Sequence, residues 1–228
     1  NVIVKQTSDS GFALTSTKDD SGSGLGLICL IKTNEYGNVL WETITSPMPD
    51  EFNQTNSILV TSDNEYMVLG VSLNTGFLCS FLTKYNSEGG VYWTKIFGEY
   101  QEDKGANEII VTNSGEYIIF GSVVDYINYV GTPYLMNVDE NGNVGWIKEF
   151  DLTSGNNGGM SFVHTSDGGF LIVFSGDDID LIKTDNTGDI QWTKHANYMH
   201  DVHITTVLQT NSQAYVFAGG AEEIVNSL

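Results

Sequence analysis

Apolar residues along the chain occur in short runs that alternate with polar turns. The runs are rich in Ile, Val, Leu, Phe and Tyr, and clusters of Gly, Asn, Asp and Ser bound them, as in β-strands joined by tight turns. No segment keeps the apolar period of an amphipathic helix, so the pattern predicts an all-β protein. The first eight runs are Val2–Val4, Phe12–Thr17, Leu25–Ile31, Val39–Ile44, Ser57–Val60, Tyr66–Ser72, Phe77–Leu82 and Val91–Phe97.

A polar turn ahead of the second run recurs through the chain. It reads Thr-Ser-Asp-Ser-Gly-Phe from Thr7 and returns in related form at Thr61, Thr112, Thr165 and Thr210, with spacings of 54, 51, 53 and 45 residues. Self-similarity at a steady period is the sequence signature of a repeat architecture. It predicts complete repeats at about 1–54, 55–105, 106–158 and 159–202, and a partial repeat at 203–228.

A second motif, Gly-x-x-x-Trp, recurs at the same phase and contains all four tryptophans of the chain. We expect each Trp to lie on the outer strand of its repeat and to fill the gap to the next repeat. Each Gly, with turn residues such as Asn38, Asn143 and Asp185, serves a tight hairpin. The eight motif residues are therefore interpreted as structural: Gly37, Trp41, Gly89, Trp93, Gly142, Trp146, Gly188 and Trp192.

The second run of each repeat is almost wholly apolar, as in Phe170–Phe174. A strand of this kind is covered on both faces, which is the situation inside a propeller blade packed between two neighbours. We predict a single β-propeller domain, 1–228, of four-stranded antiparallel blades, with five blades of which the last is incomplete. A fragment of a larger ring, or a four-bladed ring with a closing hairpin, is the alternative.

The repeats resemble those of secreted bacterial and archaeal β-propeller proteins, in which Asp-Gly-Gly-Phe/Tyr precedes an apolar strand and Leu-x-Lys-Thr-Asp-x-x-Gly-Asn-x-x-Trp follows it. The fourth repeat is the most similar, with Asp167-Gly168-Gly169-Phe170, then Leu181-Ile182-Lys183-Thr184-Asp185, Gly188 and Trp192. The resemblance spans nearly the whole chain. It implies the fold and an exported protein, and it leaves the function open, because such repeats serve many roles.

The excess of acidic residues limits the classes of partner that the protein can bind. Asp and Glu number 29 against nine Lys and no Arg, so the net charge is −20. Nucleic acid and anionic membrane surfaces need clustered basic residues and are excluded as main partners. No apolar stretch is long enough to insert into a membrane. The chain begins at Asn1 and not at Met, which indicates a processed protein or a chain trimmed at its start. We expect a secreted or cell-surface location.

Two acidic pairs follow the second strand of their repeats, Asp19-Asp20 and Asp177-Asp178, and Asp180 lies close to the second pair. Carboxylate oxygens suit Ca²⁺, so the four residues of the two pairs are candidate binding residues, with a solvated acidic turn as the alternative. The segment from Asn137 to Gly142 begins like an EF-hand loop but lacks the Glu that completes it. We therefore expect no cofactor.

Three histidines near the end of the chain, His195, His200 and His203, are candidate metal ligands. On one strand His200 and His203 would face opposite sides, so they can share a metal only in a loop. Ordinary loop histidines are the simpler interpretation. Asn53-Gln54-Thr55 is a glycosylation sequon in a predicted loop between repeats. Cys29 and Cys79 are expected to be buried free thiols.

No catalytic triad, phosphate loop or nucleophile elbow occurs in the sequence. We therefore expect a non-enzymatic extracellular propeller that binds a glycan or a surface protein, or acts in adhesion. One alternative is a subunit of a surface filament or layer that self-associates through the open edge of the incomplete blade. Another is an enzyme acting on polysaccharide, which would require two carboxylates suitably spaced in a polar pocket.

Overall fold

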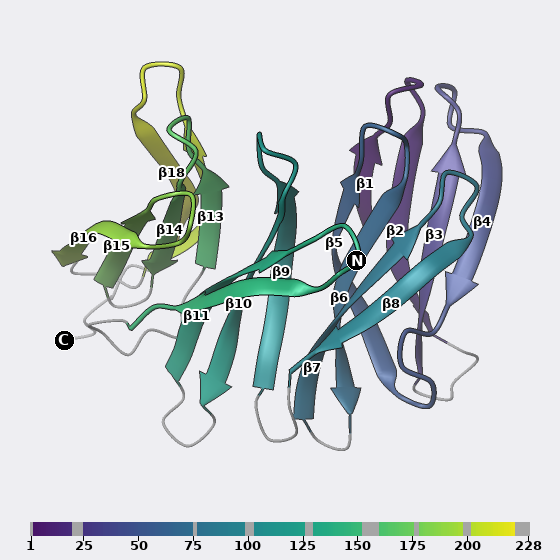
Figure 1. The fold of residues 1–228 in the computed structure, drawn as a ribbon, viewed down its shortest axis with the longest axis horizontal. Helices are drawn as coiled ribbons and strands as arrows, with labels where there is room; N and C mark the ends of the chain where they lie inside the picture. Colours follow the sequence, from purple (N-terminus) through teal and green to yellow (C-terminus); the bar gives the residue numbers. More distant parts are fainter. Residues whose placement is uncertain are drawn as a thin grey trace, which may run out of the picture. The chain divides into compact units, whose positions relative to one another are not determined.

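In a computed structural model of the protein, the described residues are 2–19, 25–74, 77–98, 103–125, 130–151, 160–175, 178–197 and 202–221. These residues form eighteen strands (Figure 1), and the described ranges contain no helix. In particular, no helix among them is long and apolar enough to cross a membrane. The prediction of an all-β protein is confirmed.

Consecutive strands pair antiparallel in sets of four, so each complete repeat forms one sheet. The first two sheets are joined by a single parallel pair between Gly26 and Phe52. Their strands are β1 (Val2–Gln6), β2 (Phe12–Asp19), β3 (Gly26–Thr33), β4 (Val39–Thr45), β5 (Phe52–Val60), β6 (Tyr66–Asn74), β7 (Phe77–Tyr85) and β8 (Val91–Phe97).

The later strands continue the same order and end in a two-stranded sheet, β17–β18. Pairing of another chain with this last sheet stays a prediction. The strands are β9 (Asp103–Val111), β10 (Tyr117–Asp125), β11 (Val130–Val138), β12 (Val144–Glu149), β13 (Met160–His164), β14 (Phe170–Ser175), β15 (Asp178–Thr184), β16 (Ile190–Asn197), β17 (Val202–Gln209) and β18 (Tyr215–Ala221).

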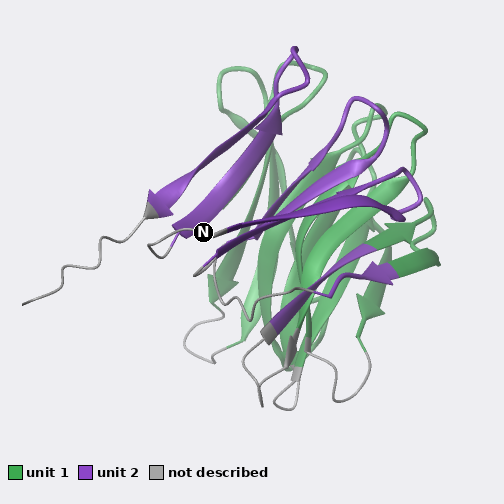
Figure 2. Ribbon diagram, turned by 90° about the vertical axis from the view of Figure 1, so that its left-hand side faces the viewer, with its two compact units in different colours: residues 1–124, 136–147 green, residues 125–135, 148–228 purple. Residues whose placement is uncertain are grey.

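The chain divides into two compact units (Figure 2). Unit 1 comprises residues 1–124 and 136–147 and contains the first two sheets and most of the third. Unit 2 comprises residues 125–135 and 148–228 and contains the fourth sheet and the two-stranded sheet. Each unit is described below by itself, and the single domain with its five repeat boundaries stays a prediction.

The Gly-x-x-x-Trp motif joins one sheet to the next within unit 1. Its glycines have positive φ, +80° at Gly37, +83° at Gly89 and +74° at Gly142, which favours glycine. A Cβ added to Gly89 would lie 2.8 Å from the ring of Trp41, and one added to Gly142 would lie 2.8 Å from the ring of Trp93. The tryptophans of the first and second sheets therefore lie directly against the turn glycine of the following sheet.

The first strands of successive sheets lie side by side, β1 with β5 and β5 with β9 in unit 1, and β13 with β17 in unit 2. Side-chain hydroxyl groups of one sheet accept hydrogen bonds from backbone N–H groups on the first strand of the next sheet. The Thr55 N–H donates to Thr17 Oγ1 at 3.1 Å, beside a β-bulge in β5. The same contact recurs from Ala106 N–H to Ser80 Oγ and from Ile204 N–H to Ser175 Oγ, both at 2.8 Å.

The sequon residue Asn53 lies inside strand β5 and not in a loop, so the predicted loop is wrong at this point. Its side chain is fully buried. The Nδ2 group donates to the carbonyl oxygens of Gly26, Met48 and Glu51 at 3.0, 2.9 and 3.0 Å, and Oδ1 accepts from the Met48 N–H at 3.2 Å. A glycan attached to Nδ2 would remove these hydrogen bonds, so Asn53 is a structural residue. The predicted strand begins at Ser57, whereas β5 begins at Phe52. The residues that follow Phe52 are polar, so the search for apolar runs did not include the first half of β5.

A buried lysine and a turn acid form an ion pair in two of the sheets. Lys32 Nζ lies 2.9 Å from Asp9 Oδ2, and Lys183 Nζ lies 2.9 Å from Asp167 Oδ2. The Thr7 hydroxyl and then the Lys32 ammonium lower the pKa of Asp9 to about 2. Burial raises the pKa of Asp167, but its hydrogen bonds from Thr165 and Lys183 prevail and hold it at about 2. Each pair ties the first turn of its sheet to the third strand.

These ion pairs predict a specific response to acid. Because the folded-state pKa of both aspartates is depressed, their contribution to stability is present above the unfolded value of about 4 and is lost as pH falls towards about 2. Both carboxylates are half-exposed, so the effect is modest. Urea unfolding midpoints measured from about pH 5 to about pH 2 test this. The difference between the native protein and the double variant Asp9→Asn/Asp167→Asn should shrink across that window, and a constant difference would contradict the assignment.

The two cysteines, Cys29 on β3 and Cys79 on β7, are buried free thiols, as predicted. Burial, and then the neighbouring Glu42 carboxylate, raise the pKa of Cys29 to about 11. A thiol with so high a pKa is a poor nucleophile, so Cys29 has a packing role.

Candidate functional site

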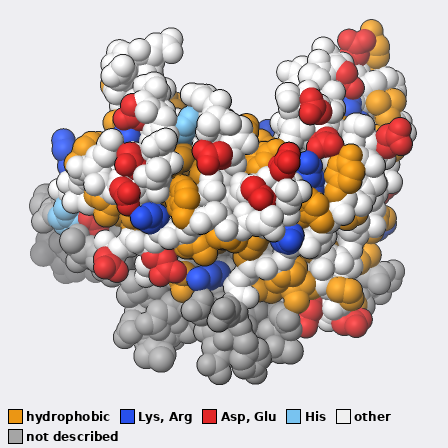
Figure 3. All heavy atoms as spheres, viewed as in Figure 1, with side chains coloured by type: hydrophobic (Ala, Val, Ile, Leu, Met, Phe, Trp, Pro, Cys, Tyr) orange, Lys and Arg blue, Asp and Glu red, His pale blue; other side chains and the backbone are white. Residues whose placement is uncertain are grey.

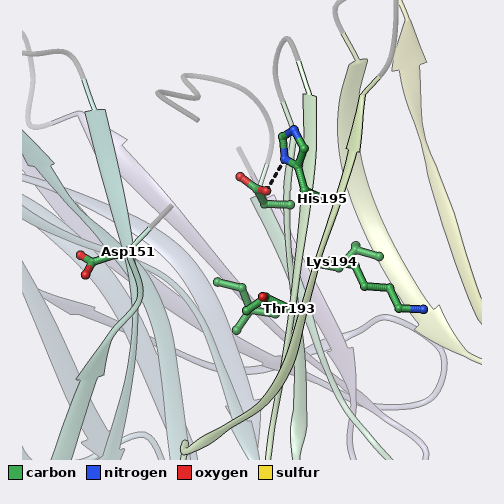
Figure 4. A pocket seen from close by; sticks show the side chains of 7 residues that line it. Asp151, Thr193, Lys194 and His195 are labelled. Carbon is green, nitrogen blue, oxygen red and sulfur yellow. Dashed lines mark hydrogen bonds and ion pairs between the residues drawn. The ribbon is translucent and has the colours of Figure 1, made fainter. Parts of the chain in front are cut away.

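A cavity of about 170 Å³ lies in unit 2 beside strands β15 and β16 (Figure 4). Five of its lining residues are polar or charged and two are apolar, and its exposed surface is mainly apolar. This mixture of a few polar groups with an apolar wall is typical of small-molecule sites. The lining residues are Asp151, Asp180, Leu181, Ile182, Thr193, Lys194 and His195.

A histidine between two carboxylates forms one side of this cavity. Asp178 and Asp180 lie two residues apart on β15 and so share a face of the sheet, and His195 is directly opposite Asp180 on β16. His195 Nδ1 lies 2.7 Å from Asp180 Oδ1, and His195 Nε2 lies 3.4 Å from Asp178 Oδ2. The Asp180 side chain is 8% exposed, whereas that of His195 is 37% exposed. Asp180 therefore orients an imidazole that a ligand can reach.

A further acidic residue lines the cavity from a different part of unit 2. Asp151 follows strand β12, and Figure 4 shows it across from His195. The residue before it, Phe150, is buried, and its N–H donates to the Pro133 carbonyl oxygen at 2.9 Å. This anchor holds the exposed Asp151 at the cavity.

The alternation of β16 separates the cavity side from the packing side of the sheet. Thr193 and His195 share one face, while Trp192 and Lys194 share the other. Trp192 packs against the apolar cluster of unit 2 that includes Leu171, and the Lys194 ammonium lies 5.5 Å from the centre of the Trp192 ring. Figure 4 shows the Lys194 side chain directed away from Asp151. The strand thus presents a hydroxyl and an imidazole to the cavity and keeps its cation on the other side.

The predicted acidic pairs are only partly described. Asp19 is an exposed residue at the end of β2, and Asp178 contacts His195, whereas Asp20 and Asp177 lie outside the described residues. Of the predicted metal ligands, His195 lies in the cavity, His203 is exposed on β17 and His200 lies outside the described residues. Among the residues that the structure describes, no three His, Cys, Asp or Glu side chains are grouped to hold a metal ion.

The EF-hand-like segment after Asn137 is a turn that recurs in every complete sheet. Asp139 Oδ1 accepts hydrogen bonds from the N–H groups of Asn141 and Asn143, at 2.9 and 2.8 Å. Such side-chain-to-backbone bonds explain the choice of Asn or Asp here. The corresponding acceptors in the turns of the other sheets are the side chains of Asn34, Asn86 and Asp185.

Sequence reasoning missed the site that the structure brings together. His195 and Asp178 were singled out for different reasons, while Asp180 and Asp151 were not named as site residues. The turn before Gly188 fixes the register of the β15–β16 hairpin, so the pairing of Asp180 with His195 was recoverable from the sequence. No sequence signal places Asp151, which comes from another strand's end.

Comparison with known proteins identifies the fold. No protein-family profile matches the sequence, and no curated protein matches it. Among solved structures, a protein of unknown function from Dyadobacter fermentans is similar with a TM-score of 0.66 at 9% identity, covering 95% of this chain and 73% of that one. The Dos1 propeller gives 0.57 at 11% identity, with coverage of 91% and 50%. A GH43 β1,3-galactosidase gives 0.56 at 10% identity, with coverage of 95% and 52%.

These likenesses show a propeller-type fold built from four-stranded antiparallel sheets. The chain spans about half the length of the Dos1 propeller and galactosidase structures that it resembles. Identities near 10% show the fold alone.

The prediction that the chain is not an enzyme is wrong. It rested on the lack of a familiar catalytic motif, yet a β1,3-galactosidase is among the structures of similar fold. Catalytic groups in such a fold come from several strands and need not form a sequence motif. The absence of a motif is therefore no ground for excluding catalysis.

Proposed function

We propose that this chain is part of a secreted or cell-surface β-propeller protein and that the unit 2 cavity binds a saccharide. The observation that carries the proposal is the exposed imidazole of His195, held at 2.7 Å by Asp180 in the wall of a cavity of about 170 Å³ that Asp151 also lines. Carboxylates and a fixed imidazole are hydrogen-bonding partners that sugar hydroxyls need. Ile182, which shares a face of the sheet with Asp180, offers an apolar surface to the C–H face of a ring.

Two further features support this proposal. The repeats resemble those of exported propellers, which favours a site exposed to extracellular glycans. We also infer that the eighteen strands belong to a ring of five blades with an incomplete last blade, because four sheets have four strands and the last has two. In such a ring a cavity beside the outer strands of one blade is open to a ligand from solution.

A binding screen tests the proposal directly. We expect the native protein to bind members of a glycan array, and His195→Gln to weaken the best of them by about tenfold or more, because one hydrogen-bonded contact in a partly buried site is lost. The matched control is Asp63→Asn, which alters an exposed acid of unit 1 and should leave the affinity unchanged. Thermal melts of both variants separate loss of binding from loss of folding. No saccharide bound by the native protein, or equal binding by His195→Gln, would contradict the proposal.

Hydrolysis of the bound saccharide is a second candidate function. Asp151 and Asp180 line the same cavity from different elements, and glycosidases use two carboxylates on either side of the scissile bond. The structurally similar GH43 protein acts on a β1,3-galactoside by its name, so β1,3-linked galactan is the first substrate to try. Release of reducing sugar by the native protein, and its loss in Asp151→Asn, would support catalysis. Binding without release over long incubation would limit the site to recognition.

A further inference from the structure

The charges around the cavity are predominantly negative. Asp151 and Asp180 line it, and Asp178 contacts the far nitrogen of His195. Asp151 is exposed and forms no ion pair with any lysine of the described residues. A carboxylate facing a small cavity attracts a cationic group and repels an anionic one, more strongly than it would in bulk water.

The lysines of unit 2 do not offset this charge, because each of the three is directed elsewhere. Lys183 is buried and binds Asp167 and the Thr184 carbonyl oxygen, at 2.9 and 2.7 Å. Lys148 pairs with Asp189 at 2.8 Å, and Lys194 lies over the Trp192 ring. The chain contains no arginine, and acidic side chains are spread over the face in Figure 3. The ammonium groups of unit 2 are therefore not available for an anionic ligand in the cavity.

We propose that the cavity selects saccharides that carry a free amine over neutral saccharides and rejects those that carry a carboxylate. This inference rests on the proposed saccharide binding and specifies its ligand class. Asp151 is the residue that determines the selection, because it lines the cavity, is exposed and can pair with a ligand ammonium. Asp180 is shielded and engaged with His195, so it acts as a positioning residue.

The size of the cavity limits how much of a glycan enters it. Its volume, about 170 Å³, is below the range of roughly 300–1,000 Å³ that is typical of sites for drug-sized ligands. We therefore expect about one sugar ring to enter, with the rest of the chain outside. The amine that decides selectivity belongs to that ring.

Calorimetry with three matched trisaccharides tests the selection at about pH 6, where an amine is protonated and a uronate is ionised. The probes are a glucosamine trimer, an N-acetylglucosamine trimer and a galacturonate trimer. We expect the glucosamine trimer to bind about tenfold tighter than the acetylated trimer, and the galacturonate trimer to give no measurable heat. Asp151→Asn should remove the preference for the amine, so that the glucosamine and acetylated trimers bind with similar affinity.

Two controls make the result decisive. Asp63→Asn reduces the net negative charge by the same amount away from the cavity and should keep the preference. Putrescine, an amine without a sugar ring, should bind far more weakly than the glucosamine trimer, and equal binding would mean general attraction to an acidic protein and overturn the inference. Equal affinity for the glucosamine and acetylated trimers overturns the selection and leaves saccharide binding intact. No binding of any trimer, or of any array glycan, overturns the proposed function as well.

Discussion

Replacing Asn53 by alanine is expected to lower the free energy of unfolding by about 3–4 kcal/mol. The side chain is fully buried and is the donor to the carbonyl oxygens of Gly26, Met48 and Glu51. Alanine leaves these three acceptors without that donor, and each unsatisfied buried group costs about 1–3 kcal/mol. The expected loss of stability is therefore larger than the loss of packing contacts alone would cause. Urea unfolding followed by tryptophan fluorescence measures it.

Two further variants sharpen this prediction. Asn53→Asp replaces the donor by a carboxylate that faces three carbonyl oxygens, so it should destabilise at least as much as alanine at neutral pH. Asn107→Ala removes an exposed asparagine from β9, the corresponding strand of the next sheet, and should change stability by less than about 0.5 kcal/mol. If Asn53→Ala and Asn107→Ala cost the same, Asn53 does not hold this connection together.

Replacing Gly89 by alanine should cost about 3 kcal/mol or more, while Gly37→Ala should cost only about 1–2 kcal/mol. Both glycines occupy the same place in the repeat, with φ of +83° and +80°. A Cβ at Gly89 would lie 2.5 Å from Thr43 Oγ1 and 2.8 Å from the Trp41 ring, whereas nothing lies within 4 Å of one at Gly37. Gly37→Ala therefore measures the backbone cost, and the excess at Gly89 measures the contact between sheets. Thermal and urea unfolding give both values.

The fold could be predicted from the sequence because the same turn and the same packing contact require the same residue types in successive repeats. A positive φ requires glycine at Gly89, and the neighbouring sheet requires a large ring from Trp41, so the two residue types stay visible at a steady period. The strand β5 was placed late because its first half is polar. Asn53 and Thr55 form hydrogen bonds with groups of the preceding sheet. These positions therefore require polar residues, and a search for apolar runs does not detect them.

The candidate site was less accessible to sequence reasoning. Asp178, Asp180 and His195 come together through the hairpin of β15 and β16, whose register the turn residues determine. Asp151 comes from the end of β12, and only the packing of Phe150 places it at the cavity. When the residues of a site come from different sheets, they are not separated by a characteristic number of residues. Sequence patterns alone therefore could not identify this site.

The central claim is that the repeats of unit 1 are blades and that Trp41 and Trp93 each pack against the turn glycine of the following blade. A double-mutant cycle on Trp41 and Gly89 tests it most directly. With alanine at position 41 the ring is gone, so Gly89→Ala should then cost about 1–2 kcal/mol less than in the native protein. The contact with Thr43 Oγ1 remains and keeps the cost above that of Gly37→Ala. The two substitutions would thus be non-additive by about 1–2 kcal/mol. If the cost of Gly89→Ala is the same with and without the Trp41 ring, the blades do not pack in this way and the account is wrong.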